Sequence, residues 1–115
     1  MLDLTNISFS SKIRGLDLSY FEHSERAKEA ALALTDLHNL RLAGVTLHPN
    51  DIKSIVEKNP LRALNLSHSS INTKALLPLT ESAKDLTHLD LSNCDKVTDF
   101  DVLLIAQNLP QLEHC

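Results

Sequence analysis

A group of residue types that could do chemistry lies in the second half of this chain. They are His68, His88, Asp90, Cys94, His114 and Cys115. A cysteine nucleophile needs an imidazole within about 3 Å and access to substrate, and a metal needs several ligands brought to one point. No HxH, HxxxH or CxxC spacing fixes these residues locally, so either chemistry depends on the elements that position them.

Those elements recur along the chain. A leucine motif of the form L-x-x-L-x-L appears as IRGLDLS at 13, LHNLRLA at 37, LRALNLS at 61 and LTHLDLS at 86. A further start, LEHC, opens at 112. Successive starts lie 24, 24, 25 and 26 residues apart. MLDLTN at the front follows the same rhythm but comes too early to include a helix. Self-similarity at such a period indicates a repeat architecture.

Each repeat predicts one strand and one helix. Leucines two positions apart point to the same face of a strand, so Leu64, Leu66, Leu89 and Leu91 are predicted to be core. Between the motifs, apolar residues three and four positions apart predict helices. The clearest sets are Ala27, Ala30, Ala31 and Leu34; Ile52, Ile55 and Val56; Ala75, Leu76, Leu79 and Ala83; and Val102, Leu103, Ile105 and Ala106.

Helix starts and ends are marked in most repeats. Start signals stand at Ser24, at Asn50 with Asp51 behind Pro49, at Asn72, and at Thr98 with Asp101 three residues later. The pairs Asn59-Pro60 and Leu109-Pro110 predict helix ends.

These motifs and their spacing resemble the leucine-rich-repeat family, in its cysteine-containing and ribonuclease-inhibitor-like subtypes. The resemblance implies an α/β fold, a short curved solenoid with parallel strands on the concave face and helices on the convex face. It implies one domain over 1–115. Within it lie a partial N-terminal turn at 1–12, repeats at 13–36, 37–60, 61–85 and 86–111, and the start of a truncated repeat at 112–115.

Cys94 lies three residues after Leu91, where this family usually has Asn or Cys. The equivalent positions in the other repeats hold Phe21, Val45 and Ser69. A position that accepts such different side chains is a packing slot, so we predict that Cys94 is a buried structural thiol. The family's asparagine ladder is missing, which leaves open how the backbone groups of the turns are paired.

The outward residues of the strands form columns across the concave face. Between the leucines come Asp3, Asp17, Arg41, Asn65 and Asp90; before them Gly15, Asn39, Ala63, His88 and His114; after them Thr5, Ser19, Ala43, Ser67 and Ser92; and next Asn6, Tyr20, Gly44, His68 and Asn93. From these columns we predict a protein-binding surface of Asp17, Tyr20, Arg41, Asn65, His68, His88, Asp90 and His114. The alternative is that Asp17 and Arg41 form an ion pair that only keeps the sheet soluble.

Composition excludes several classes of function. The 115 residues carry a net charge of −4 and no basic stripe, which argues against nucleic acid. No apolar run reaches the length of a membrane span, and no signal peptide opens the chain. The two glycines, Gly15 and Gly44, cannot form a phosphate loop. We expect no catalysis, no cofactor and no bound metal, and the two cysteines fit a reducing, cytoplasmic compartment.

The leading hypothesis is a module that binds a partner protein through the concave face. The irregular repeats resemble short leucine-rich-repeat effectors of intracellular bacteria such as Legionella, which would imply delivery into a host cell and inhibition or sequestration of a partner enzyme. One alternative is the substrate-receptor portion of a ubiquitin-ligase subunit. Another is a metal-binding or catalytic protein that uses His68, His88, Asp90 and His114. The open C-terminal edge leaves room for self-association.

Overall fold

The leucine motifs form the strands of one parallel sheet. The computed structural model describes residues 13–20 and 24–113. The strands are β1 (Gly15–Asp17), β2 (Asn39–Arg41), β3 (Ala63–Asn65) and β4 (His88–Asp90), and they pair in the order β1-β2-β3-β4. Their register places Leu16, Leu40, Leu64 and Leu89 in one row. The register that the motif spacing predicts is confirmed.

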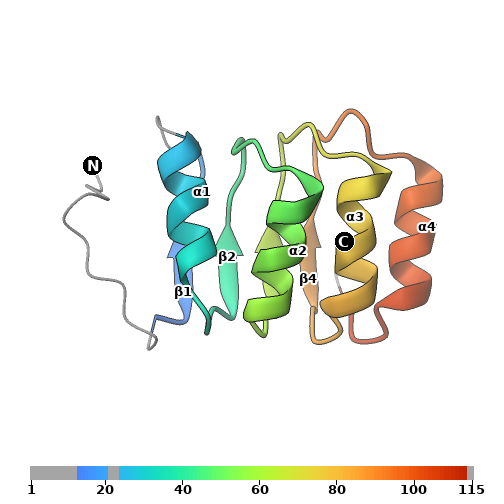
Figure 1. Cartoon of the computed structure of the whole chain (residues 1–115). Coiled ribbons are helices and arrows are strands. Elements are labelled where there is room, and N and C mark those ends of the chain that lie inside the picture. Colours follow the sequence, from blue (N-terminus) through green and yellow to red (C-terminus); the bar gives the residue numbers. More distant parts are fainter. Residues whose placement is uncertain (1–12, 21–23, 114–115) are drawn as a thin grey trace.

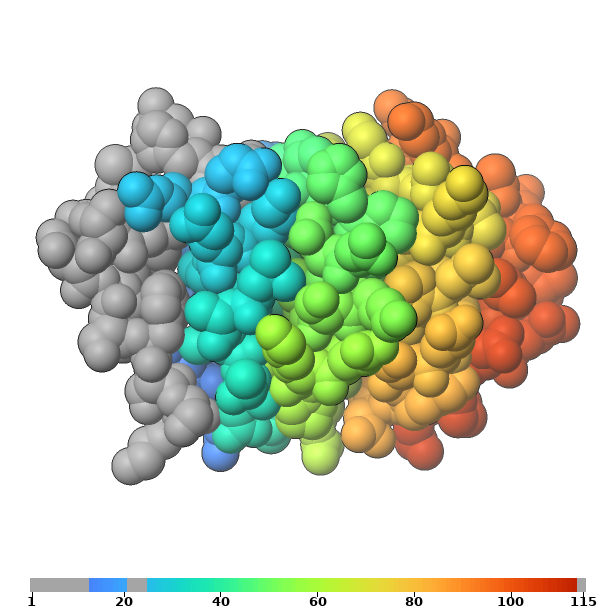
Figure 2. Space-filling model, viewed as in Figure 1, coloured from blue at the N-terminus to red at the C-terminus, as the bar shows by residue number. Residues whose placement is uncertain are grey.

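A helix follows each strand and covers the same side of the sheet (Figure 1). The helices are α1 (Ser24–Ala33), α2 (Pro49–Lys58), α3 (Thr73–Ser82) and α4 (Asp99–Asn108). Figure 2 shows the molecule from this helical, convex side. The other side of the sheet, which none of these four helices covers, is the concave face. The predicted α/β solenoid is therefore confirmed.

Two of the predicted helix starts are confirmed and one is shifted. Asn72 accepts a hydrogen bond from the Ala75 amide at 3.3 Å, and Thr98 and Asp101 bond each other's backbone amides. In α2 the cap is His48 rather than Asn50. Pro49 occupies the first helical position, where its fixed φ and missing N–H fit. The Asp51 carboxylate then accepts from the His48 amide at 3.0 Å.

The helices end where the sequence predicts. The residue after α2 is Asn59 and the residue after α4 is Leu109, and both stand directly before a proline. A proline disfavours helical geometry in the residue before it, so each helix stops and the chain returns to the sheet.

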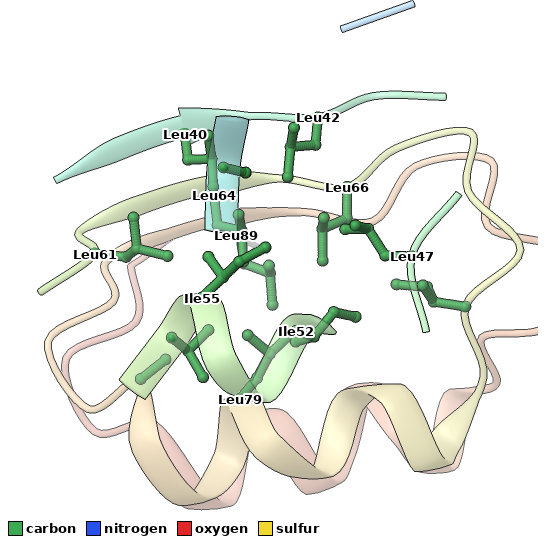
Figure 3. Packing of buried hydrophobic residues seen from close by; sticks show 14 of the residues in the cluster. Leu40, Leu42, Leu47, Ile52, Ile55, Leu61, Leu64, Leu66, Leu79 and Leu89 are labelled. Carbon is green, nitrogen blue, oxygen red and sulfur yellow. The ribbon is translucent and has the colours of Figure 1, made fainter. Parts of the chain in front are cut away.

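The core lies between the sheet and the helices. Figure 3 shows Leu40, Leu64 and Leu89 of the sheet facing Ile52 and Ile55 of α2 and Leu79 of α3. All six are at most 4% exposed. No single strand and helix could bury these side chains alone, and stacked repeats bury them between layers.

The turns after the strands pair their backbone groups with the next layer. The Leu42 amide donates to the Asn65 carbonyl and the Gly44 amide to the Ser67 carbonyl, at 2.8 and 2.9 Å. The Leu66 and His68 amides repeat this with Asp90 and Ser92. This ladder continues the parallel pairing past the strands, so these amides are satisfied without an asparagine ladder.

Cys94 is a buried thiol, as predicted. Its side chain is 7% exposed and its Sγ donates to the Leu66 carbonyl of the preceding layer at 3.1 Å. Burial raises the pKa of the Cys94 thiol, which lowers the thiolate fraction at neutral pH. Ser69, in the equivalent slot, donates to the Val45 carbonyl at 3.4 Å.

The last layer is less buried than the inner layers. Ile52 and Leu76 are 2% and 1% exposed, whereas Val102, at the same position of α4, is 42% exposed. Leu91 was predicted to be core but is only half-buried. Within the part of the chain that the structure describes, no further layer covers Val102 and Leu91. The prediction that Leu91 is a core residue was therefore wrong.

None of the helices within residues 24–113 is long and apolar enough to cross a membrane.

Candidate functional site on the concave face

The central column of the concave face carries charges of both signs. Strand register places Asp17, Arg41, Asn65 and Asp90 side by side on β1 to β4. Asp17 and Arg41 are exposed, while Asn65 and Asp90 are half-buried. The column therefore reads acidic, basic, neutral and acidic across the sheet, as the sequence predicts.

Three members of this column hold the turn that follows them. The side-chain oxygens of Asp17, Asn65 and Asp90 each accept from the backbone amide two residues on, all at 2.9 Å. Asn65 also accepts from the Ser67 hydroxyl at 2.7 Å. Such bonds mimic a backbone turn and fix the side chain against the main chain.

Asp90 is an ionised carboxylate at neutral pH. Its hydrogen bonds from Ser92, first the side chain and then the backbone, lower the pKa of Asp90, and electrostatic interactions with His68 and then Arg41 add smaller effects in the same direction. A hydrogen bond to the charged form of an acid favours that form. Asp90 thus presents a permanent negative charge to any partner of the concave face.

Arg41 is the exception in the column. It cannot accept a hydrogen bond, and the amide of Ala43, two residues on, is satisfied by the Ser19 hydroxyl of the preceding layer at 3.1 Å. Among residues 13–20 and 24–113, the Arg41 guanidinium has no hydrogen bond and no ion pair. The alternative of an Asp17–Arg41 ion pair is therefore not realised.

A second row lies along the end of the strands, where the backbone takes left-handed geometry. Tyr20, Gly44, His68 and Asn93 have φ values of 56°, 75°, 57° and 58°. The Tyr20 ring lies over Gly44 so closely that a Cβ there would come within 2.7 Å of the ring. The ring centroids of Tyr20 and His68 are 5.8 Å apart, and the Asn93 amide nitrogen lies 3.3 Å from His68 Nε2.

Tyr20 is the largest exposed side chain of this row. It remains 65% exposed although it contacts Gly44 and His68. An aromatic ring that is held in place yet accessible loses little entropy on binding, and tyrosine is common among residues that dominate interfaces.

The surface between these rows is hollowed. One depression of about 760 Å³ is lined by Asn39, Arg41, Ala63, Leu64, Asn65, His88, Leu89, Asp90 and Ser92. A second depression lies beside Tyr20 and shares Arg41 and Asn65 with the first. Arg41 therefore stands between the two hollows, and its long side chain is reached from both.

The structure places the predicted site residues unevenly. Asp17, Arg41, Asn65, His88 and Asp90 line these depressions, and Tyr20 and His68 form the edge row. His114 lies outside the described residues, as do Asp3, Thr5 and Asn6 of the columns. Ala43 and Ser67, which were expected on the surface, are 4% and 6% exposed. Their small side chains are buried under the turns. The prediction that the residues directly after the leucine motif are exposed was therefore wrong at Ala43 and Ser67.

The chemistry considered for the histidines has no geometric support among the described residues. No group of three or more His, Cys, Asp and Glu side chains there could hold a metal ion. The His88 ring is 2.9 Å from the Thr87 hydroxyl, while the Cys94 thiol points into the core.

Two features of the site were missed from the sequence. The exceptional Arg-Leu-Ala, in a series that otherwise reads Asp-Leu-Ser or Asn-Leu-Ser, signals that the turn of the second repeat is held differently. Gly44, alone in a row of Tyr, His and Asn, marks the place where the Tyr20 ring lies.

Comparisons with known proteins support the fold. No protein-family profile matches the sequence, and no curated protein matches it. Among solved structures, the chain is similar to the tropomodulin C-terminal domain of Caenorhabditis elegans, with a TM-score of 0.69 and 16% identity over 90% of this chain and 72% of that one. That domain has a leucine-rich-repeat-like fold. At this identity the likeness establishes the architecture alone.

Proposed function

We propose that this chain is a protein-interaction module that binds a partner protein through its concave face. The observation that carries the proposal is the Arg41 guanidinium, which makes no hydrogen bond or ion pair to any described residue and lies at the centre of a hollowed sheet face that helices α1 to α4 leave open. Arginine is among the residues that most often dominate protein interfaces. A guanidinium that no described residue binds is available for a partner.

The remaining surface fits the same role. Ionised Asp90 and exposed Asp17 can set the register of a charged partner, and Tyr20 supplies an apolar contact beside them. Catalysis is no part of the proposal, because the one described thiol is buried. Occupying the face would block or sequester the bound partner, which is the role that the likeness to bacterial effectors suggests.

The test is affinity capture from a cytosolic lysate with a charge-reversed variant, Arg41→Glu with Asp90→Lys. A matched control reverses one basic and one acidic residue on α3, Lys74→Glu with Glu81→Lys. Both residues are exposed on the convex side, and the new charges suit the helix dipole. We expect wild type and control to retain a partner that the concave variant loses, with all three folded by circular dichroism.

Equal capture by all three proteins would contradict the proposal. It would move the interface to the helices, where Phe100 and Leu103 are 67% and 54% exposed.

A further inference from the structure

The charges of the concave face indicate which kind of partner segment can bind there. Asp17, Asn65 and Asp90 each use a side-chain oxygen to hold their own turn. Arg41 replaces such a residue, and the Ser19 hydroxyl takes over its bond to the main chain. No described residue therefore uses the hydrogen-bond donors of the guanidinium, whose planar fork matches a carboxylate.

The surroundings of Arg41 select among anions. Asp17 lies one strand away and Asp90 two strands away in the same column. Two negative neighbours disfavour a phosphate group, which carries nearly two negative charges. They are compatible with the single charge of an aspartate or glutamate side chain. Asp90 makes no ion pair with a described residue, so its negative charge can attract a cation of the partner.

The distance between the two charges selects the partner's geometry. Neighbouring strands are about 4.8 Å apart, so Arg41 and Asp90 are separated by about 9.6 Å along the column. Side chains seven residues apart on a helix lie on one face and about 10.5 Å apart. On an extended strand, same-face residues are about 6.8 or 13.6 Å apart, and neither value fits the separation of Arg41 and Asp90.

The width of the face agrees with this choice. Each strand has three residues, which gives the sheet a width of about 10 Å, close to the diameter of a helix with its side chains. Ala63 lines the larger depression and lies on β3 between Asn39 and His88, beside the column that holds Arg41 and Asp90. Its small side chain leaves room for a helix to approach.

We infer that the concave face binds an α-helix of the partner protein that crosses the strands, with an acidic residue at Arg41 and a basic residue two turns away at Asp90. This inference rests on the proposed function and deepens it. The basic residue faces an ionised carboxylate, and the acidic residue faces a guanidinium that pairs with no other group in the described part of the chain.

The test uses alanine-rich helical peptides and isotope-labelled protein, with binding followed by amide chemical shifts. The main peptides carry Glu and Lys seven residues apart, in both orders so that either helix direction is covered. Comparison peptides have Gln in place of Glu, phosphoserine in place of Glu, or Glu and Lys four residues apart. We expect shifts on β2 to β4, and binding about three- to five-fold weaker for each comparison peptide, as expected for an exposed ion pair.

Two protein variants show whether the difference in affinity between the Glu and Gln peptides depends on Arg41. In Arg41→Gln the difference between the Glu and Gln peptides should disappear. Arg26→Gln on α1, which removes an exposed arginine from the convex side, should keep it.

The inference is overturned if no peptide shifts the β2 to β4 amides at millimolar concentration. It is also overturned if the phosphoserine peptide, the Gln peptide or the four-residue spacing binds as well as the main peptides. Capture of a partner that still depends on Arg41 and Asp90 would then leave the proposed function standing without the helix. If, in addition, no captured partner depended on Arg41 and Asp90, the proposed function would also be wrong.

Discussion

The third and fourth repeats have the same motif but different surroundings. Leu76 of α3 is 1% exposed because α2 and α4 lie on either side of its helix, whereas Val102, at the same position of α4, is 42% exposed. The polar contacts differ too, since the Asn59 side chain joins two layers, whereas the Asn108 side chain bonds, among the described residues, only the Leu104 carbonyl of its own helix. In a solenoid, therefore, the neighbouring layer rather than the residue type determines which side chains are buried.

The largest expected effect is at the buried member of this pair. Leu76→Ala should lower the free energy of unfolding by about 2–5 kcal/mol, because a cavity forms between layers. Val102→Ala should lower it by less than about 1 kcal/mol, because half of that side chain is already in water. Urea denaturation of both variants measures the two values. Similar losses would mean that α4 is covered as completely as α3.

Substitution of Asn59 tests whether side-chain hydrogen bonds between layers stabilise the inner repeats. The Asn59 side chain, which is 4% exposed, accepts from the Leu37 amide at 2.8 Å and donates to the Leu34 carbonyl at 3.1 Å. Asn59→Ala would leave both buried backbone groups without a partner, at an expected cost of about 1–3 kcal/mol. Asn108→Ala, the control in the last layer, should cost clearly less in the same urea titration. A larger cost for Asn108 would contradict the layer-joining role of Asn59.

Substitution of Gly44 tests how tightly the Tyr20 ring packs against the backbone of the next layer. The φ of Gly44 is 75°, and the Tyr20 ring lies 2.7 Å from the point that a Cβ would occupy. Gly44→Ala should therefore cost about 1–2 kcal/mol from backbone strain, plus displacement of the ring. In a Tyr20→Ala background only the backbone strain should remain. Thermal unfolding of the four proteins in this cycle measures the coupling. An equal cost in both backgrounds would show that the ring does not press on Gly44.

Much of this architecture could be predicted from the sequence because it depends on local periodicity. Strand register follows from leucines two residues apart, so Leu64 and Leu89 align as expected. The caps at Asn72 and Thr98 follow from side chains that bond amides three residues away. Both features are determined within a few residues, where propensity and spacing carry the information.

The features that could not be predicted depend on contacts between layers. Ala43 and Ser67 follow the strand pattern but are buried by turns. The sequence left open whether Arg41 pairs with Asp17, and only the side-chain positions show that Arg41 makes no ion pair with a described residue. His48 replaced Asn50 as the cap because Pro49 begins the helix. In each case the deciding neighbour is far away in sequence or competes with a nearer signal.

The smallest expected effect concerns the polar tether between the last two helices. Asp101 is 1% exposed and accepts from the Thr73 hydroxyl of α3 at 2.6 Å. This bond first, and those from Thr98 next, lower the pKa of Asp101. A carboxyl whose pKa is lower in the folded state contributes stability above its unfolded value of about 3.9, and the contribution is lost as the pH falls through the folded value.

We therefore expect the unfolding temperature to fall between pH 5 and pH 2 by a smaller amount in Asp101→Asn than in wild type. Thr73→Val should give an intermediate slope, because it removes the largest cause of the shift while the Thr98 bonds remain. The inner helix α3 has Ala75 at the position of Asp101, so the α2–α3 junction has no carboxylate at this point. Identical pH slopes in wild type and Asp101→Asn would show that the α3–α4 junction is held by its apolar contacts only.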